Sequence, residues 1–392
     1  MLDIRALNQQ IHAMTADLFQ QADASSERLE AALALLRRGA AENSPLLERL
    51  EAFAALREPP WMVAQPAEAL ETTRALPALA APYSVVATDG SQIAPSHHEI
   101  ALCYLLNVGR ILYTYGTGER PLQDSFPQLF HREADMRPSV GRRRVSINEE
   151  LIAAFRNLHE AKSLVGLAEM ACERGHPAIA MQDGTLIQWM LEDKPEDFQD
   201  ELLEGHLEAL NRLRDLRVPV VGYLSSSRAT DVVNLLRLVA CPKARLECER
   251  CAWNEPPCEG HVPLSDRRMW ARRLAVGERS PIFYSTAKIL AKYGAHRVAF
   301  FYLHVGAEVA RLEVPLWVAE DDALLDRVHA YAYDQAQKGM GYPISLQEAH
   351  NQAVVSREDR QRFFSLLSQR MQQAGMTVAV SNKQLKKRVG VV

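Results

Sequence analysis

Long hydrophobic runs are missing from this 392-residue sequence: no stretch approaches the roughly 18 uncharged apolar residues that a membrane-spanning helix needs. The first residues, MLDIRALNQQ, carry acid early and lack an apolar core, so we expect no secretory signal and a cytoplasmic protein without membrane contact. Glycine and proline number only 19 and 20, which excludes collagen-like and low-complexity chains. An excess of positive charge is also absent, because 45 basic residues face 49 acidic ones. The overall charge therefore does not indicate a protein that coats nucleic acid, although a local basic channel is compatible with it.

The chain is long enough for two or three structural units at about 100–200 residues each. Residues 1–80 are rich in alanine, poor in β-branched residues, and carry leucines at three- and four-residue spacing, which predicts a helical arm. This arm either packs as a layer on the main domain or binds a second copy or another partner. Residues 81–392 are expected to form the second unit, with 241–264 as a cysteine-rich insertion inside it.

Short apolar strands and amphipathic helices follow one another through this second unit. A strand at 83–88 is expected to stop at an Asp-Gly pair, and segments 100–107 and 110–115 to form a hairpin around Val108 and Gly109. Residues 117–146 are expected to be a loop. Further strands are predicted at 178–182, 218–224, 298–303 and 309–314, and helices at 148–174, 229–239, 320–337, 345–354 and 356–374. This order predicts an α/β fold with a mixed sheet flanked by helices.

Two acidic residues, Asp89 and Asp183, follow predicted strands, and each stands directly before a glycine. Open α/β sheets bind ligands at the carboxyl ends of their strands, so we expect the two side chains at one site. Adjacent carboxylates repel each other unless they are protonated or bridged by a cation, and their hard oxygens suit Mg²⁺ or Mn²⁺. Three acids in this order would make an RNase H-like site that hydrolyses phosphodiesters with divalent metal ions. The third is Glu160, on the helix between the strands, with Glu149, Glu150 and Glu169 as rivals.

Four of the six cysteines are clustered: Cys241, Cys248, Cys251 and Cys258 fall within 18 residues. Only one pair, Cys248 and Cys251, has the Cys-x2-Cys spacing that is usual for metal-binding loops. We expect the four thiols to bind a structural Zn²⁺ or an iron–sulfur cluster, the alternative being free thiols.

Four short motifs resemble those of the NurA nuclease family and occur in the family's order. They are residues 85–91 (VVATDGS), 178–186 (AIAMQDGTL), 311–315 (RLEVP), and 341–350, which begins GYP and ends EAH. The resemblance spans residues 83–354. It implies an RNase H-like core, a homodimer, a preference for Mn²⁺, and 5′ to 3′ DNA degradation with single-strand cutting. It also implies a partnership with the hexameric ATPase HerA in DNA end resection and double-strand break repair.

The resemblance also implies roles for single residues. Asp89 and Asp183 would be metal ligands, and Glu160 would be the helix carboxylate. His350 would bind metal or position the attacking water, and Tyr342 would contact the scissile region. Without the family context, His350 would be read as a surface histidine and Tyr342 as a residue that packs a turn.

Arginines are the candidate contacts to DNA. Arg142, Arg143 and Arg144 lie just before the Glu160 helix, where they would either bind phosphate or form a solvated charged loop. Arg311, in the third motif, would either contact phosphate or pair with Glu313.

The primary hypothesis is therefore a metal-dependent DNA nuclease. A second is a catalytically weak adaptor that binds DNA ends and docks on the ATPase, which would be expected to lose at least one of the two aspartates. A third is an RNase H-like enzyme that acts on RNA or on an RNA–DNA hybrid. Comparing cleavage of matched DNA and RNA strands would separate the first from the third.

Overall fold

The computed structural model describes residues 3–95, 102–141, 143–243, 245–248, 251, 254 and 256–375. Within this part of the chain, nine strands form one mixed sheet in the order β1-β9-β10-β11-β8-β7-β2-β3-β4. β2, β7 and β8 run parallel, and the other neighbouring strands are antiparallel. The strand bounds are β1 Gln65–Pro66, β2 Tyr83–Ile93, β3 Tyr104–Tyr115, β4 Leu122–Phe130, β7 Ala178–Asp183, β8 Val220–Leu224, β9 Phe283–Tyr284, β10 Val298–His304 and β11 Val309–Pro315; β5 Ser139–Val140 and β6 Arg143–Arg144 form a separate small hairpin. The predicted mixed sheet flanked by helices is confirmed.

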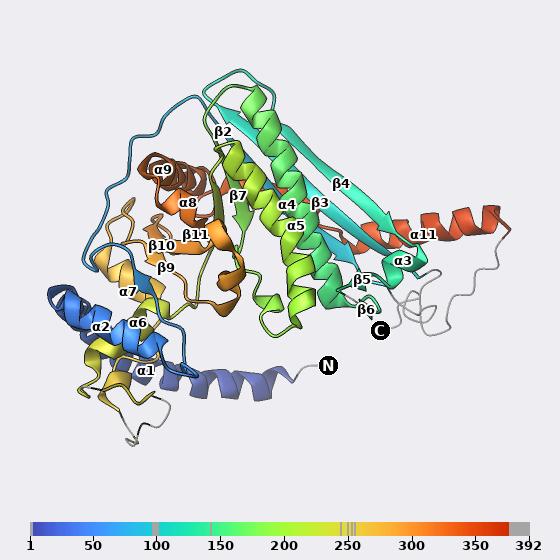
Figure 1. The fold of residues 1–392 in the computed structure, drawn as a ribbon. Coiled ribbons are helices and arrows are strands. Elements are labelled where there is room, and N and C mark those ends of the chain that lie inside the picture. Colours follow the sequence, from blue (N-terminus) through green and yellow to red (C-terminus); the bar gives the residue numbers. More distant parts are fainter. Residues whose placement is uncertain are drawn as a thin grey trace.

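Helices cover both faces of this sheet (Figure 1). α4 and α5 lie side by side on one face, with α4 over β2, β3 and β7, while α10 packs on β2 and β3 from the other face. The C-terminal α11 extends away from the sheet. The helix bounds are α1 Ile4–Ala41, α2 Asn43–Ala54, α3 Glu133–Met136, α4 Glu149–Glu173, α5 Glu196–Asp215, α6 Asp231–Ala240, α7 Asp266–Arg273, α8 Leu316–Ala319, α9 Asp322–Lys338, α10 Ile344–Ala353 and α11 Arg357–Gln373.

Two expectations for the first strands were wrong. β2 does not stop at the Asp-Gly pair but continues to Ile93, and β3 runs without a break through Gly109, so no hairpin turns at Val108 and Gly109. At Gly109 an added Cβ would lie 2.1 Å from the carbonyl oxygen of Ala349 and 2.6 Å from the amide nitrogen of Ala353. Glycine is therefore needed at this position because the α10 backbone packs directly on β3.

The expected loop at 117–146 contains a strand. β4 pairs antiparallel with β3 from Leu122 to Phe130 and forms the edge of the sheet, so the loop prediction was wrong for these residues. The Arg110 guanidinium donates two hydrogen bonds to Asp124, at 2.8 and 2.7 Å, and the rings of Tyr104 and Phe130 stack with centroids 4.6 Å apart. Cross-strand pairs of this kind stabilise an otherwise polar edge strand.

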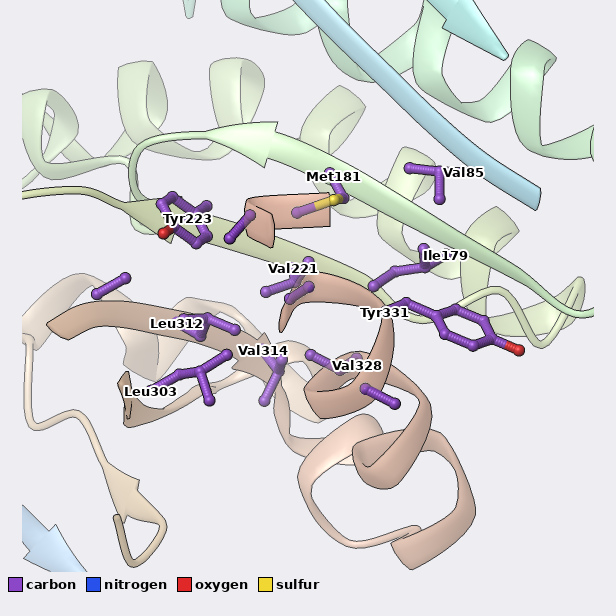
Figure 2. Packing of buried hydrophobic residues seen from close by; sticks show 14 of the residues in the cluster. Val85, Ile179, Met181, Val221, Tyr223, Leu303, Leu312, Val314, Val328 and Tyr331 are labelled. Carbon is purple, nitrogen blue, oxygen red and sulfur yellow. The ribbon is translucent and has the colours of Figure 1, made fainter. Parts of the chain in front are cut away.

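The largest core cluster lies between the sheet and helices α9 and α10 (Figure 2). Alternate residues of β2 divide between the faces, because successive strand side chains point to opposite sides. Val85 joins the cluster under α9 and α10, whereas Val86 joins the cluster under α4 and α5. Burial on both faces explains the nearly continuous apolar sequence of β2 and β7.

The first 80 residues are only partly helical. α1 and α2 pack against α6 and α7 through buried residues such as Leu36 and Phe53, and β1 then joins the edge of the main sheet by pairing with β9. None of the described helices combines the length and the hydropathy needed to cross a membrane. The division into an arm and a nuclease domain stays a prediction.

Candidate active site

The two predicted aspartates lie at the same level of neighbouring parallel strands. β2 and β7 are in register from Ser84 opposite Ala178 to Thr88 opposite Gln182, so the next residues along the two strands are Asp89 and Asp183. β7 ends at Asp183, and Gly184 adopts a positive φ of 87° that turns the chain away from the sheet. The structure therefore brings the predicted pair of carboxylates to one edge of the sheet, although only β7 ends there.

Glu160 is buried beneath this edge, in the middle of α4. Asn148 caps that helix by accepting a hydrogen bond from the Leu151 amide, which sets the start of the helix. The Glu160 side chain extends to the β2 backbone beside Asp89: a Cβ added to Gly90 would lie 2.2 Å from Glu160 Oε1. Glycine at position 90, inside β2, thus gives the carboxylate access to the strand.

Burial and mutual repulsion raise the free energy of the ionised carboxylates at this site. Burial, opposed by Arg156 and reinforced by Asp89 and Asp183, raises the pKa of Glu160 to about 8. Burial also raises the pKa of Asp183, and the charge of Asp89 adds to the effect, whereas a hydrogen bond from Tyr342 opposes it. Like charges brought together in this way are stabilised by protons or by a bound cation.

The α10 region supplies a partner for each aspartate. His350 Nδ1, on α10, lies 2.7 Å from Asp89 Oδ2, and the exposed fraction of the His350 side chain is 64%. The Tyr342 hydroxyl, just before α10, donates to Asp183, and its ring packs edge-on against Tyr223 at 5.6 Å. The structure therefore brings together Asp89, Glu160, Asp183, Tyr342 and His350.

The donor set fits a hard divalent cation. Glu160 Oε1 is buried and, among the described residues, has no hydrogen-bond partner; Arg156 Nε lies 3.1 Å away but is not aligned to donate. A buried oxygen without a donor is costly, and a cation would satisfy it. In the described part of the chain, no three acidic, histidine or cysteine side chains converge on one ion as they stand. As they stand, Arg156 lies within ion-pair distance of Glu160 and His350 within ion-pair distance of Asp89.

Arg156 is a residue of the site that the sequence did not predict, whereas Gly90 was noted as the glycine that follows Asp89. Arg156 stands one helical turn before Glu160, and its side chain crosses the space above Gly90. The i, i+4 spacing of an arginine and a glutamate was visible in the sequence, but this spacing is common on helix surfaces and does not by itself indicate a site.

Arg311 pairs with Glu313, the second of its two expected roles, so the expected phosphate contact was wrong. It is 3% exposed, its guanidinium stacks 3.7 Å from the Phe300 ring centroid, and it pairs with Asp231 at 2.7 Å and with Glu313 at 3.0 Å. Glu313 in turn accepts hydrogen bonds from the Thr185 hydroxyl at 2.7 Å and from the Leu186 amide at 3.0 Å. The pair therefore holds the loop that follows Asp183, and Arg311 has no free surface for a phosphate.

The remaining candidates lie elsewhere. Arg143 and Arg144 are exposed on β6, whose hairpin partner β5 packs against α5, and Arg142 lies outside the described residues. The four clustered cysteines line a different part of the molecule, next to α6.

Comparison with known proteins fits this geometry. The sequence model of the NurA domain family matches residues 83–355. Over 95% of this chain and 98% of the other, the fold resembles the crystal structure of the NurA nuclease from Sulfolobus solfataricus, with 11% identity and a TM-score of 0.54. A structure of NurA bound to dAMP and manganese aligns over 74% of this chain and 88% of the other, with 11% identity and a TM-score of 0.37. A search of curated protein sequences found no match. Because the family match covers well over half of its length, this chain belongs to the NurA domain family.

Proposed function

We propose that this protein is a divalent-metal-dependent nuclease that hydrolyses phosphodiester bonds in DNA. The observation that carries the proposal is the meeting of Asp89, Asp183 and the buried Glu160 at one edge of the sheet, where burial and then the charges of the two aspartates raise the pKa of Glu160. The negative charges of such a cluster repel one another, and a bound divalent cation reduces this repulsion. Membership of the NurA domain family supports nuclease activity.

Asp89, Glu160 and Asp183 would hold Mn²⁺ or Mg²⁺, which supplies a water of lowered pKa and neutralises charge on the phosphate. Tyr342 orients Asp183 by donating to it, and the edge-on contact with Tyr223 fixes the tyrosine ring. His350 is held by Asp89 through Nδ1, and its exposed ring is placed to exchange a proton with solvent or substrate. Gly90 keeps the space through which Glu160 reaches the strand.

The finer assignments are also proposals. The strand order β4-β3-β2-β7-β8, with an antiparallel β3 and parallel β2, β7 and β8, supports an RNase H-like core. The motif resemblance supports a homodimer that degrades DNA from 5′ to 3′, cuts single strands, and acts with a HerA-type ATPase in end resection. The exposed Arg143 and Arg144 are candidates for phosphate contacts, because guanidinium groups bind phosphate well.

The test compares matched single strands of DNA and RNA, and linear duplex DNA, with Mn²⁺, Mg²⁺ or EDTA. We expect cleavage of DNA that requires the metal and that is lost in Asp89→Asn, which keeps the side-chain shape but removes a charge. Preferred cleavage of the RNA strand would favour the RNA-acting alternative. If the DNA stays uncleaved with every metal ion, both with and without the ATPase, the result would favour the DNA-end adaptor and contradict the proposal.

A further inference from the structure

Four cysteines far from the acidic residues in the sequence surround one small cavity. Cys241 follows the last residue of α6, Cys248 and Cys251 stand in the next segment, and Cys258 lies in the short helical turn Pro257–Glu259. All four line a cavity of about 80 Å³, and all four are free thiols. None of the five candidate active-site residues lines this cavity.

The walls of this cavity are fixed by neighbouring elements. Arg49, on α2, donates to the carbonyl oxygens of Leu238 at 2.8 Å and of Cys241 at 2.6 Å. Arg237, on α6, stacks over the Trp61 ring with its guanidinium 3.5 Å from the ring centroid and pairs with Glu259 at 2.7 Å. The cavity therefore lies where the N-terminal helices meet α6, and its lining is held from both sides.

The surroundings favour a bound cation with several thiolate ligands. Four thiol groups border this one cavity, and cysteine thiolates are ligands of zinc and of iron–sulfur clusters. Two basic side chains, Arg237 and Lys243, also line the cavity and would offset the negative charge of a tetrathiolate centre.

Among the described residues, the four thiols as they lie do not form a site for a single metal ion. Zinc–sulfur bonds are about 2.3 Å long, so the four sulfurs of a zinc site crowd around one point. In the described chain, no group of three or more cysteine, histidine or acidic side chains is arranged around a single ion, yet four cysteines border the same space. An iron–sulfur cluster is held by four cysteine thiolates around a larger body.

We propose that Cys241, Cys248, Cys251 and Cys258 hold one iron–sulfur cluster that fixes the segment after α6, which Arg49 of α2 contacts at Cys241. This binding is independent of the proposed nuclease activity. A centre that binds only the folded chain stabilises it, and here the stabilised part is the junction around Arg49 and Trp61.

The test uses the full-length chain, purified without oxygen, and measures iron, acid-labile sulfide, zinc and visible absorbance. We expect about two or four irons per chain with equal sulfide, depending on the cluster type. Cys248→Ser and Cys251→Ser should lose the iron and the absorbance, whereas Cys172→Ser, outside the cluster, should keep both. If the cluster variants do not fold, the metal content of the wild type decides by itself.

Two results would overturn the proposal. One zinc per chain without sulfide would replace the cluster by a zinc site. Failure to gain colour after incubation of the metal-free chain with ferrous iron, sulfide and thiol reductant would show that the cavity holds no cluster. Metal-dependent DNA cleavage is read separately, so the outcome for the cysteines and the outcome for the acidic site are distinguishable.

Discussion

Glu160 should make the metal-free protein less stable as the pH rises, and Glu160→Gln should remove this effect. Burial raises the pKa of Glu160 from 4.5 to about 8, so between these values the folded chain holds a proton that the unfolded chain has released. The free energy of unfolding then falls with rising pH, by up to about 1.4 kcal/mol per pH unit. Between about pH 5 and about pH 7.5 the loss amounts to about 3 kcal/mol.

Urea denaturation in EDTA at several pH values measures this effect, and the informative quantity is the difference between wild type and variant. Asp183 has a raised pKa as well, and the buried His206 has a lowered one, so both proteins retain a pH dependence. Glu169→Gln is the matched control, because Glu169 lies on the same helix in an exposed pair with Arg212. The unfolding free energy of Glu169→Gln should change with pH in the same way as that of the wild type. Parallel pH curves for wild type and Glu160→Gln would refute the reasoning.

Three further predictions follow from the same structure. Mn²⁺ binding should release the Glu160 proton, so the affinity measured by calorimetry should rise about tenfold per pH unit below about pH 8; a pH-independent affinity would contradict this. Gly109→Ala should lower the unfolding free energy by about 3 kcal/mol or more and weaken cleavage, because the new Cβ collides with α10, whereas Gly118→Ala, in open space, should leave the thermal melt unchanged. Arg311→Met should cost about 3–5 kcal/mol of unfolding free energy because it leaves Glu313 buried and unpaired. Equal melts for Arg311→Met and wild type would be evidence against this pairing.

The sequence predicted the parts of the site that depend on local pattern. The apolar strands before Asp89 and Asp183 are short, continuous and followed by glycine, which is typical of buried strands that end near a ligand site. The helix that carries Glu160 starts at a capping asparagine and has apolar residues on one side. These signals lie within a few residues of each acid, so no long-range contact was needed to find them.

The errors arose where a distant segment decides the local structure. Gly109 was interpreted as a turn because glycine usually marks one, but the reason for it is the α10 backbone, which lies about 240 residues later in the chain. β4 was interpreted as a loop because its sequence is polar. It is a strand because its backbone pairs with the edge of β3. Likewise, nothing local to Arg311 says that Asp231 and Phe300 surround it.

The most direct measurement is Mn²⁺-dependent cleavage of single-stranded DNA by wild type, Asp183→Asn and Asp193→Asn. Asp183 ends β7 beside Asp89 and accepts a hydrogen bond from Tyr342, whereas Asp193 is an exposed aspartate ten residues later. We expect Asp183→Asn to fold normally and to cleave no DNA, and Asp193→Asn to cleave DNA like the wild type. Full activity in a folded Asp183→Asn variant would contradict the assignment of the acidic cluster as the catalytic site.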